Sequence, residues 1–251
     1  MQTVRQNNAR AGAYSRLFLV LLTDLCYDKK EGGDDMTARE FYSLAGKPIG
    51  QFVKPFGFKK RGRFFYRITD DGVIQQFCLL WLNRIFTVRF DLSSIYSHNG
   101  HDNEGDEIYQ IIDNSNDWLS DYHSHVETLD AAAAICFESV KDILLPFFET
   151  HKDPKSAREF IVTHNLRIQG GYNKFDLREI GFYLSMGDMN ACRDFLVHYI
   201  ENSSKYNQIW WREVEQEYQR LLDAIVCNDT EYISDYMNNK KKETYAEYKW
   251  K

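Results

Sequence analysis

The chain has 251 residues, of which 43% are hydrophobic and 27% charged, and this balance excludes a disordered protein, a collagen-like repeat and a coiled-coil rod. A chain of this length buries enough surface to form a core without metal ions or disulfide bonds. Its formal net charge of −6 argues against general attraction to nucleic acid or to an anionic membrane.

Residues 1–35 are interpreted as an upstream extension that precedes a native start at Met36. The segment 30–36 contains Glu-Gly-Gly, which a purine-rich bacterial ribosome-binding site encodes when it is translated in frame. Thr37 and Glu40 then form a capping box, the usual opening of a helix whose first amides need partners. A helix is therefore expected to begin directly after Met36.

The cysteines predict a cytoplasmic protein. They number five, lie far apart and form no Cys-x-x-Cys pair, so they favour reduced core thiols over a disulfide framework or a zinc site. The apolar run 17–22 is too short to cross a membrane and fits a short buried helix over 16–27. Arginines precede this run, as they do in export signals, and that interpretation stays open.

After Thr37 the hydrophobic period changes from that of a helix to that of strands. The helix has one apolar stripe, which consists of Phe41, Leu44, Ala45, Ile49, Phe52, Val53 and Phe56. Pro48 predicts a kink or a restart. Three strands of an antiparallel meander follow, over 63–69, 73–82 and 85–92. Asp70-Asp71-Gly72 favours a tight hairpin turn, and the second strand, apolar on both faces, is expected to be central.

The rest of the chain is predicted to be mainly helical. A polar loop over 93–117 holds a short edge strand at 108–112, and Pro146 bends or ends a long helix over 118–144. Shorter helices follow Asp153-Pro154, the Asp176 capping box and the Gly187-Asp188 turn, and a charged tail over 240–251 is expected to fray. Two more helices are marked by their apolar residues, one by Trp210, Val214, Tyr218, Leu221 and Ile225 and a last short one by Tyr232, Ile233 and Tyr236. The sequence thus predicts an α+β fold. A three- or four-stranded antiparallel sheet packs with helices over 36–150, and an all-helical extension covers 151–251.

Residues 56–67 carry a resemblance to a known family. Their sequence is Phe-Gly-Phe-Lys-Lys-Arg-Gly-Arg-Phe-Phe-Tyr-Arg, preceded by an amphipathic helix and followed by a hairpin. This arrangement resembles the uncharacterised bacterial family called domain of unknown function 4304, over residues 37 to about 150. The run Cys78-Leu79-Leu80-Trp81 departs from the more polar strand end of that family. The resemblance implies an α+β fold in the bacterial cytoplasm, and it carries no activity or catalytic residue.

Charges of opposite sign are segregated along the sequence. Six cations and no acid lie between Lys54 and Arg67, whereas eleven acids and no cation lie from Asp91 up to Lys141. The candidate binding residues are Lys59, Lys60, Arg61, Arg63, Asp102, Glu104, Asp106 and Glu107. One interpretation is that the two stretches neutralise each other or are simply solvated. A second makes the acidic stretch a docking surface for a basic protein, as an inhibitor of a nuclease toxin requires.

A third interpretation assigns the cations to RNA. Aromatic side chains interleave with them at Phe58, Phe64 and Phe65, and bases stack on such rings. Phe64 and Phe65 point to opposite faces of a strand, so only one of them is available for stacking. The net negative charge of the chain also argues against nucleic acid.

Chemical motifs are weak. His98, His101 and Asp102 share one loop and form the ligand set of an alternative function, a metal-dependent hydrolase that uses residues 98–106. The acidic run after Asp102 lacks the glycine and the glutamate of a calcium loop. No nucleophile elbow, phosphate-binding loop or dinucleotide fingerprint is present, and no cofactor is predicted. The sequence therefore favours a non-enzymatic bacterial protein-interaction module, of an immunity or regulatory kind, with an unidentified partner.

Overall fold

The structure is a computed structural model that describes residues 38–82, 85–97, 106–107, 128–164, 177–203 and 209–249. Contacts divide the chain into two compact units. Unit 1 comprises Met1–Phe65, Phe77–Phe90 and Asp106–Phe147, and unit 2 comprises Tyr66–Gln76, Asp91–Gly105 and Phe148–Lys251. Strands of one sheet contribute residues to both units. The domain boundaries that the sequence suggested, after residues 35 and 150, stay predictions.

The sheet has five strands within these ranges, and neighbours in the sheet are neighbours in the chain. They are β1 (Lys59–Arg61), β2 (Phe64–Ile68), β3 (Val73–Leu82), β4 (Ile85–Ser94) and β5 (Asp106–Glu107). β4 and β5 pair antiparallel, with Arg89 opposite Glu107. The predicted α+β class with an antiparallel meander is confirmed. β1 was missed because three successive exposed polar residues carry no alternating signal, and the predicted edge segment 108–112 lies outside the described residues.

The β2–β3 hairpin has the turn that its sequence predicts. Gly72 adopts the left-handed conformation, with φ at +79°, and its amide donates to the Thr69 carbonyl at 3.0 Å. The Thr69 amide in turn donates to the Val73 carbonyl at 2.9 Å. Only glycine adopts this conformation without strain, and a Cβ there would also lie 3.0 Å from Ile95 Cδ1. β3 follows with consecutive buried residues and lies between β2 and β4, as expected for a central strand.

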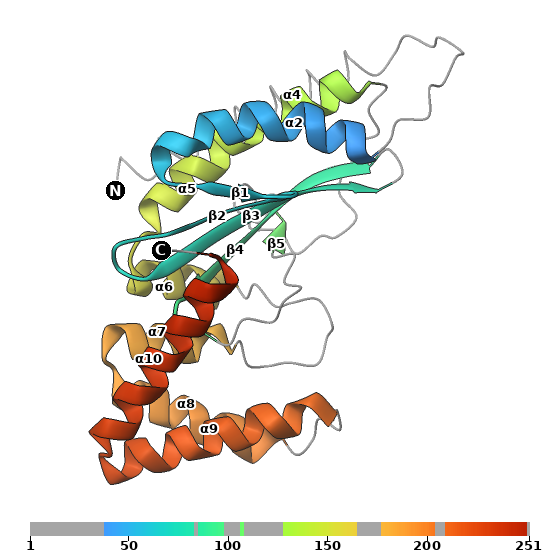
Figure 1. Ribbon diagram of the computed structural model, residues 1–251. Coiled ribbons are helices and arrows are strands. Elements are labelled where there is room, and N and C mark those ends of the chain that lie inside the picture. Colours follow the sequence, from blue (N-terminus) through green and yellow to red (C-terminus); the bar gives the residue numbers. More distant parts are fainter. Residues whose placement is uncertain are drawn as a thin grey trace, which may run out of the picture. The chain divides into compact units, whose positions relative to one another are not determined.

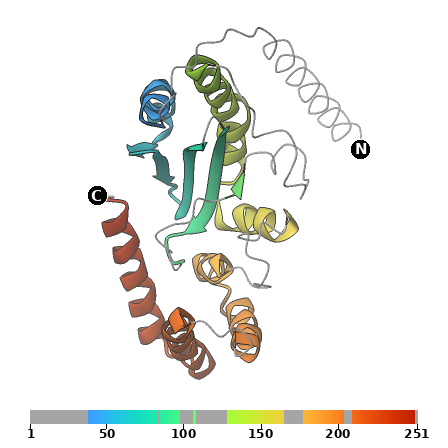
Figure 2. The same ribbon diagram turned by 90° about the vertical axis from the view of Figure 1, so that its right-hand side faces the viewer.

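Two helices pack side by side in unit 1, α2 (Ala38–Val53) and α4 (Leu129–Ser139), as Figures 1 and 2 show. Aromatic contacts join them to each other and to the sheet. The ring centroids of Phe52 and Phe137 lie 5.3 Å apart, and that of Phe41 lies 6.2 Å from Phe86 on β4. Burial of these apolar faces is the main stabilising term of unit 1.

The apolar stripe of α2 is narrower than the sequence suggested. Phe41, Ala45, Ile49 and Val53 are buried, whereas Leu44 and Phe56, which follows the helix, are each 39% exposed and lie outside the buried part of the predicted stripe. The helix runs through Pro48 without a restart. Pro48 cannot donate to the Leu44 carbonyl, but both residues lie on the exposed side, where water can satisfy that carbonyl.

The long helix over the middle of the chain also continues past its proline. Thr128 caps α4, and its hydroxyl accepts the Ala131 amide at 3.2 Å. A π-helical turn, η2 (Val140–Leu144), joins α4 to α5 (Leu145–Thr150), which contains Pro146. A wider turn at this place avoids the clash between the proline ring and the preceding turn. The predicted residues 118–127 lie outside the described ranges.

Unit 2 contains a run of helices, each of which contacts the next. They are α6 (Pro154–His164), α7 (Arg178–Met186), α8 (Met189–Ser203), α9 (Ile209–Cys227) and α10 (Thr230–Glu247). The last four share a core that includes Leu196, Tyr199, Tyr218 and Leu221. The predicted helix ends at Asp153 and at Gly187-Asp188 are confirmed: each aspartate accepts an amide of the next helix, and Gly187 has φ at +68°.

The prediction of a short last helix followed by a frayed tail was wrong, because α10 is one helix over Thr230–Glu247. The Thr244 hydroxyl donates to the Ile95 carbonyl at 3.0 Å, and both residues are buried. The Tyr66 hydroxyl donates to the Tyr248 carbonyl at 2.7 Å, and the two rings lie 5.0 Å apart. The sequence did not predict these contacts, because the tail is rich in charged residues and the residues that it contacts lie far away in sequence.

α7 is held against the end of β4 by a buried ion pair and a close backbone approach. Arg178 Nη1 lies 2.5 Å from Asp91 Oδ1, with both side chains under 10% exposed. A Cβ on Gly181 would lie 2.6 Å from the Ser97 amide nitrogen and 2.9 Å from Ser97 Cα, and would also collide with the Ser97 hydroxyl. Only a glycine fits at this point of the helix.

Gly181→Ala is expected to lower the free energy of unfolding by about 2 kcal/mol, because the added methyl group meets backbone that cannot rotate away. This sign is opposite to the usual effect in a helix, where alanine stabilises by about 0.5–1 kcal/mol. Gly50→Ala is the matched control, since its Cβ would lie at an ordinary 3.5 Å from Phe65 Cε1. Urea unfolding of the two variants measures the difference, and an equal effect in both would contradict the close approach.

Candidate protein-binding edge strand

The cationic edge, defined as Lys59, Lys60, Arg61 and Arg63, is a candidate binding surface in unit 1. The first three residues form β1, the first strand of the sheet, and all three are exposed. Within the described ranges β1 has a strand neighbour on one side only, β2. A charged side chain is thus presented at each of three successive positions along a sheet edge.

Two glycines and one aromatic residue set the position of β1. Gly57, with φ at +87°, ends the short helix η1 (Lys54–Phe56), and its amide donates to the Lys54 carbonyl at 3.0 Å. Phe58 then enters the core, where its ring meets that of Phe77 edge-on at 5.6 Å. Gly62, with φ at +61°, turns the chain from β1 into β2. The apolar anchor before the strand and the turn after it fix β1 without burying its charges.

Lys60 points toward α2. Its ammonium nitrogen lies 5.6 Å from the centroid of the Phe65 ring, a cation–π distance. A Cβ on Gly46 of α2 would lie only 2.5 Å from that nitrogen, so the glycine leaves the space that the lysine fills. Partial burial lowers the pKa of the Lys60 ammonium. Because strand side chains alternate, Lys59 and Arg61 belong to the opposite face.

Arg63 completes the cationic edge in the turn before β2. Its guanidinium carbon lies 5.2 Å from the centroid of the Phe64 ring, and both residues are half-buried. Phe65 is fully buried and stacks on Phe77 at 4.6 Å. Since Phe58 is buried as well, the aromatic rings that the RNA interpretation required are in the core or under Arg63.

The predicted acidic binding residues are not brought to the cationic edge by the described part of the chain. Asp106 and Glu107 form β5, at the other end of the strand order from β1. Asp102 and Glu104 lie outside the described residues, as do the alternative metal ligands His98 and His101. Mutual neutralisation of the two charged stretches therefore finds no support between β1 and β5.

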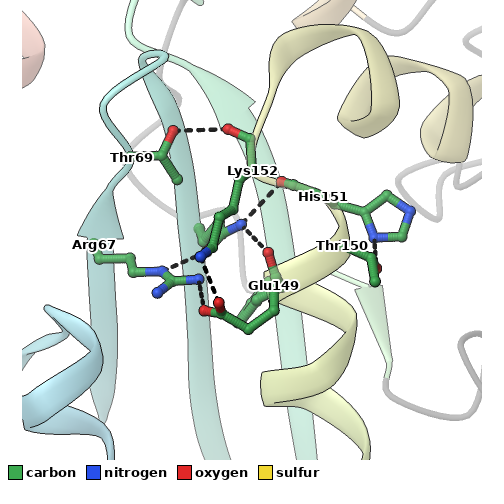
Figure 3. A network of polar contacts seen from close by, with 8 residues as sticks. Arg67, Thr69, Glu149, Thr150, His151 and Lys152 are labelled. Atoms are coloured by element: carbon green, nitrogen blue, oxygen red, sulfur yellow. Dashed lines mark hydrogen bonds and ion pairs between the residues drawn. The ribbon is translucent and has the colours of Figure 1, made fainter.

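Arg67 is the last cation of the stretch that begins at Lys54, but it is 6% exposed and belongs to a polar cluster of unit 2 (Figure 3). Its Nε donates to Gln75 Oε1 at 2.5 Å, and its Nη2 lies 2.8 Å from Glu149 Oε1. Lys152 forms a second ion pair with Glu149. The Thr69 hydroxyl donates to the Lys152 carbonyl at 2.8 Å. The cluster joins the β2–β3 hairpin to the end of α5.

Gln75 is the centre of this cluster. Its amide nitrogen donates to the carbonyl of Phe148, near the end of α5, at 2.6 Å and to the carbonyl of His151, just after that helix, at 2.9 Å. Its oxygen accepts from Arg67. The polar atoms thus satisfy one another, which is typical of a structural network rather than a reaction centre. The sequence did contain a signal, because Gln75 and Gln76 are consecutive in an apolar strand and alternation turns one of them inward.

The described residues contain no group of three or more His, Cys, Asp or Glu side chains able to hold a metal ion. Cys78, Cys136 and Cys192 are buried free thiols, as expected, while Cys227 is exposed and Cys26 lies outside the described ranges. Burial raises the pKa of the Cys192 thiol to about 12, which keeps it protonated and unreactive at neutral pH.

Comparisons with known proteins identify no relative: no family model matches the chain, no curated protein matches it, and no solved structure matches it. The resemblance of residues 56–67 to domain of unknown function 4304 therefore stays a prediction. Across the helices that the structure describes, none has both the length and the apolar character needed to cross a membrane.

Glu149→Gln is expected to weaken the dependence of stability on acid. Burial alone would raise the pKa of Glu149, but hydrogen bonds and charges from Lys152 and Arg67 outweigh it and hold that pKa below its ordinary value. A carboxylate with a lowered pKa stabilises the fold above its unfolded pKa of about 4.3, and this contribution is lost as the pH falls through the folded pKa. The melting temperature of the wild type should therefore fall more steeply from neutral pH into this acidic range than the melting temperature of the variant.

The control is Glu201→Gln, which removes an exposed carboxylate of α8. It should leave the acid dependence of the melting temperature unchanged. Parallel curves for wild type and Glu149→Gln would show that the Glu149 ion pairs do not contribute to folding stability.

Proposed function

We propose that the chain is a non-enzymatic protein-interaction module that contacts its partner through the cationic edge. The observation that carries this proposal is the exposure of three successive cations on a strand at the edge of the sheet. The polar cluster around Gln75 and Glu149 contains charged groups, as a catalytic centre does, but these groups form structural hydrogen bonds and an ion pair with one another and with the backbone. The proposed setting is the bacterial cytoplasm, in an immunity or regulatory role, on the strength of the family resemblance and the free thiols.

The partner that suits the cationic edge is an acidic protein. The sequence suggested the converse, a basic partner bound by the acidic stretch, and two members of that stretch form ion pairs within the chain. Asp91 is buried against Arg178, and Glu138 pairs with Lys141 at 2.9 Å, which together with hydrogen bonding lowers the Glu138 pKa. Docking of a basic protein on Asp102, Glu104, Asp106 and Glu107 stays a prediction.

Charge reversal of β1 tests the proposal. We expect immobilised wild-type protein to retain acidic proteins from a lysate of the source cells, and the variant Lys59→Glu, Lys60→Glu, Arg61→Glu to lose them. Retention should also disappear at about 0.5 M salt, where the Debye length shrinks to about 4 Å. Quantitative mass spectrometry of the eluates measures both effects.

The matched control reverses three other exposed cations, Lys155, Arg220 and Lys242, and so changes the net charge by the same amount. It should retain the same proteins as the wild type. Equal losses in both variants would show that total charge, rather than the cationic edge, governs retention, and equal retention by the β1 variant would refute the proposal.

The non-enzymatic part of the proposal has its own test. We expect the purified full chain to contain no stoichiometric metal by elemental analysis, and the variant His98→Ala, His101→Ala, Asp102→Ala to keep the partner retained by the wild type. A stoichiometric metal that is lost in this variant, together with hydrolysis of a phosphodiester substrate, would favour the metal-dependent hydrolase instead.

A further inference from the structure

We propose that the partner presents an extended acidic segment that adds to β1 as a further strand of the sheet. This inference rests on the proposed function and specifies how the cationic edge binds. An edge strand is a template for another chain, because main-chain groups on its outer side can pair with an incoming strand. β1 is such an edge within the described part of the chain, and its three side chains are exposed.

Charge decides which strand can pair there. Cations on an edge strand discourage indiscriminate pairing, and three in a row repel a second copy of β1 and oppose neutral apolar strands. The same three charges favour an acidic segment, since opposite charges across a strand pair strengthen pairing and like charges weaken it. The lysines and the arginine that protect this edge from aggregation therefore also select its occupant.

The faces of β1 define the chemistry of the segment. Lys60 lies on the α2 side, over the Phe65 ring and beside Gly46. Lys59 and Arg61 lie on the opposite side by strand alternation. That side also carries Phe64, because Phe65 faces α2, and Arg63 lies over the Phe64 ring. An occupant with three successive acidic residues meets one cation on the α2 side and two on the other, where Arg63 adds a further positive charge.

Peptide binding to the full chain tests the strand addition. The probe is the fluorescein-labelled peptide Thr-Val-Glu-Glu-Glu-Val-Thr, and the charge control replaces each Glu by Gln. Each opposite-charge pair across a strand is expected to raise affinity about threefold, so the Gln peptide should bind about 30-fold more weakly. Fluorescence anisotropy at low salt measures both affinities.

Backbone methylation separates strand pairing from charge attraction. Two further peptides carry N-methyl groups on alternate amides, at the odd or at the even positions, with all charges kept. Successive amides of a strand point to opposite edges, so only one of these sets faces β1. We expect one methylated peptide to bind about as well as the parent and the other at least about tenfold more weakly.

Each outcome decides a different claim. Equal binding of both methylated peptides overturns strand addition but leaves the cationic edge as a charged binding surface. Equal binding of the Glu and Gln peptides, or unchanged binding of the Glu peptide by the Lys59→Glu, Lys60→Glu, Arg61→Glu variant, overturns the proposed function as well. Tighter binding of a seven-nucleotide oligouridylate than of the Glu peptide, lost in the same variant, would assign the edge to nucleic acid and reject the acidic protein segment.

A peptide with lysine in place of each glutamate, Thr-Val-Lys-Lys-Lys-Val-Thr, tests whether the charge-reversed variant can still bind an added strand. If the variant is folded and pairing is by strand addition, this peptide should bind it about as tightly as the Glu peptide binds the wild type. A variant that binds neither peptide while its unfolding transition matches that of the wild type contradicts the proposal.

Discussion

The hydrogen bonds of Gln75 are the constraint on which the centre of unit 2 depends. A fully buried glutamine in a strand must find partners for both ends of its amide, because an unsatisfied buried polar group costs about 1–3 kcal/mol. It finds them in Arg67 on β2 and in the carbonyls of Phe148 in α5 and His151 just after α5. The position of α5 relative to the hairpin, and the burial of Arg67 against Glu149, both follow from this requirement.

The local features of the fold could be predicted from the sequence because their causes are local. Asp153 begins a helix through the hydrogen bond that its side chain accepts, and Gly187 ends one through its left-handed backbone. Gly72 makes the hairpin turn through the same backbone conformation. The apolar run of β3 required a central strand. By contrast, Arg67 meets Glu149 across 82 positions, and no periodicity within a short window carries that information.

The cationic stretch contains positively charged residues of two roles within a few positions, one at the surface and one in a buried polar cluster. Lys59, Lys60 and Arg61 were predicted as candidate binding residues, and they are exposed at the edge of the sheet. Arg67 belongs to the same run of cations, yet it is buried and held by Gln75 and Glu149. What separates them is their position in the sheet: β1 lies at the edge, where three polar residues can stay in water, whereas β2 has a strand on each side. The charge pattern alone reports neither position.

The contact between Tyr66 and Tyr248 has a consequence for how unit 2 is made in the cell. These residues are 182 positions apart, and Thr244 reaches back to Ile95 across 149. A chain emerging from the ribosome from its N-terminus therefore exposes the Tyr66 and Ile95 surfaces until α10 has been synthesised. Contacts between residues so far apart in sequence slow folding, so unit 2 keeps part of its apolar surface uncovered during synthesis until α10 can pack on it.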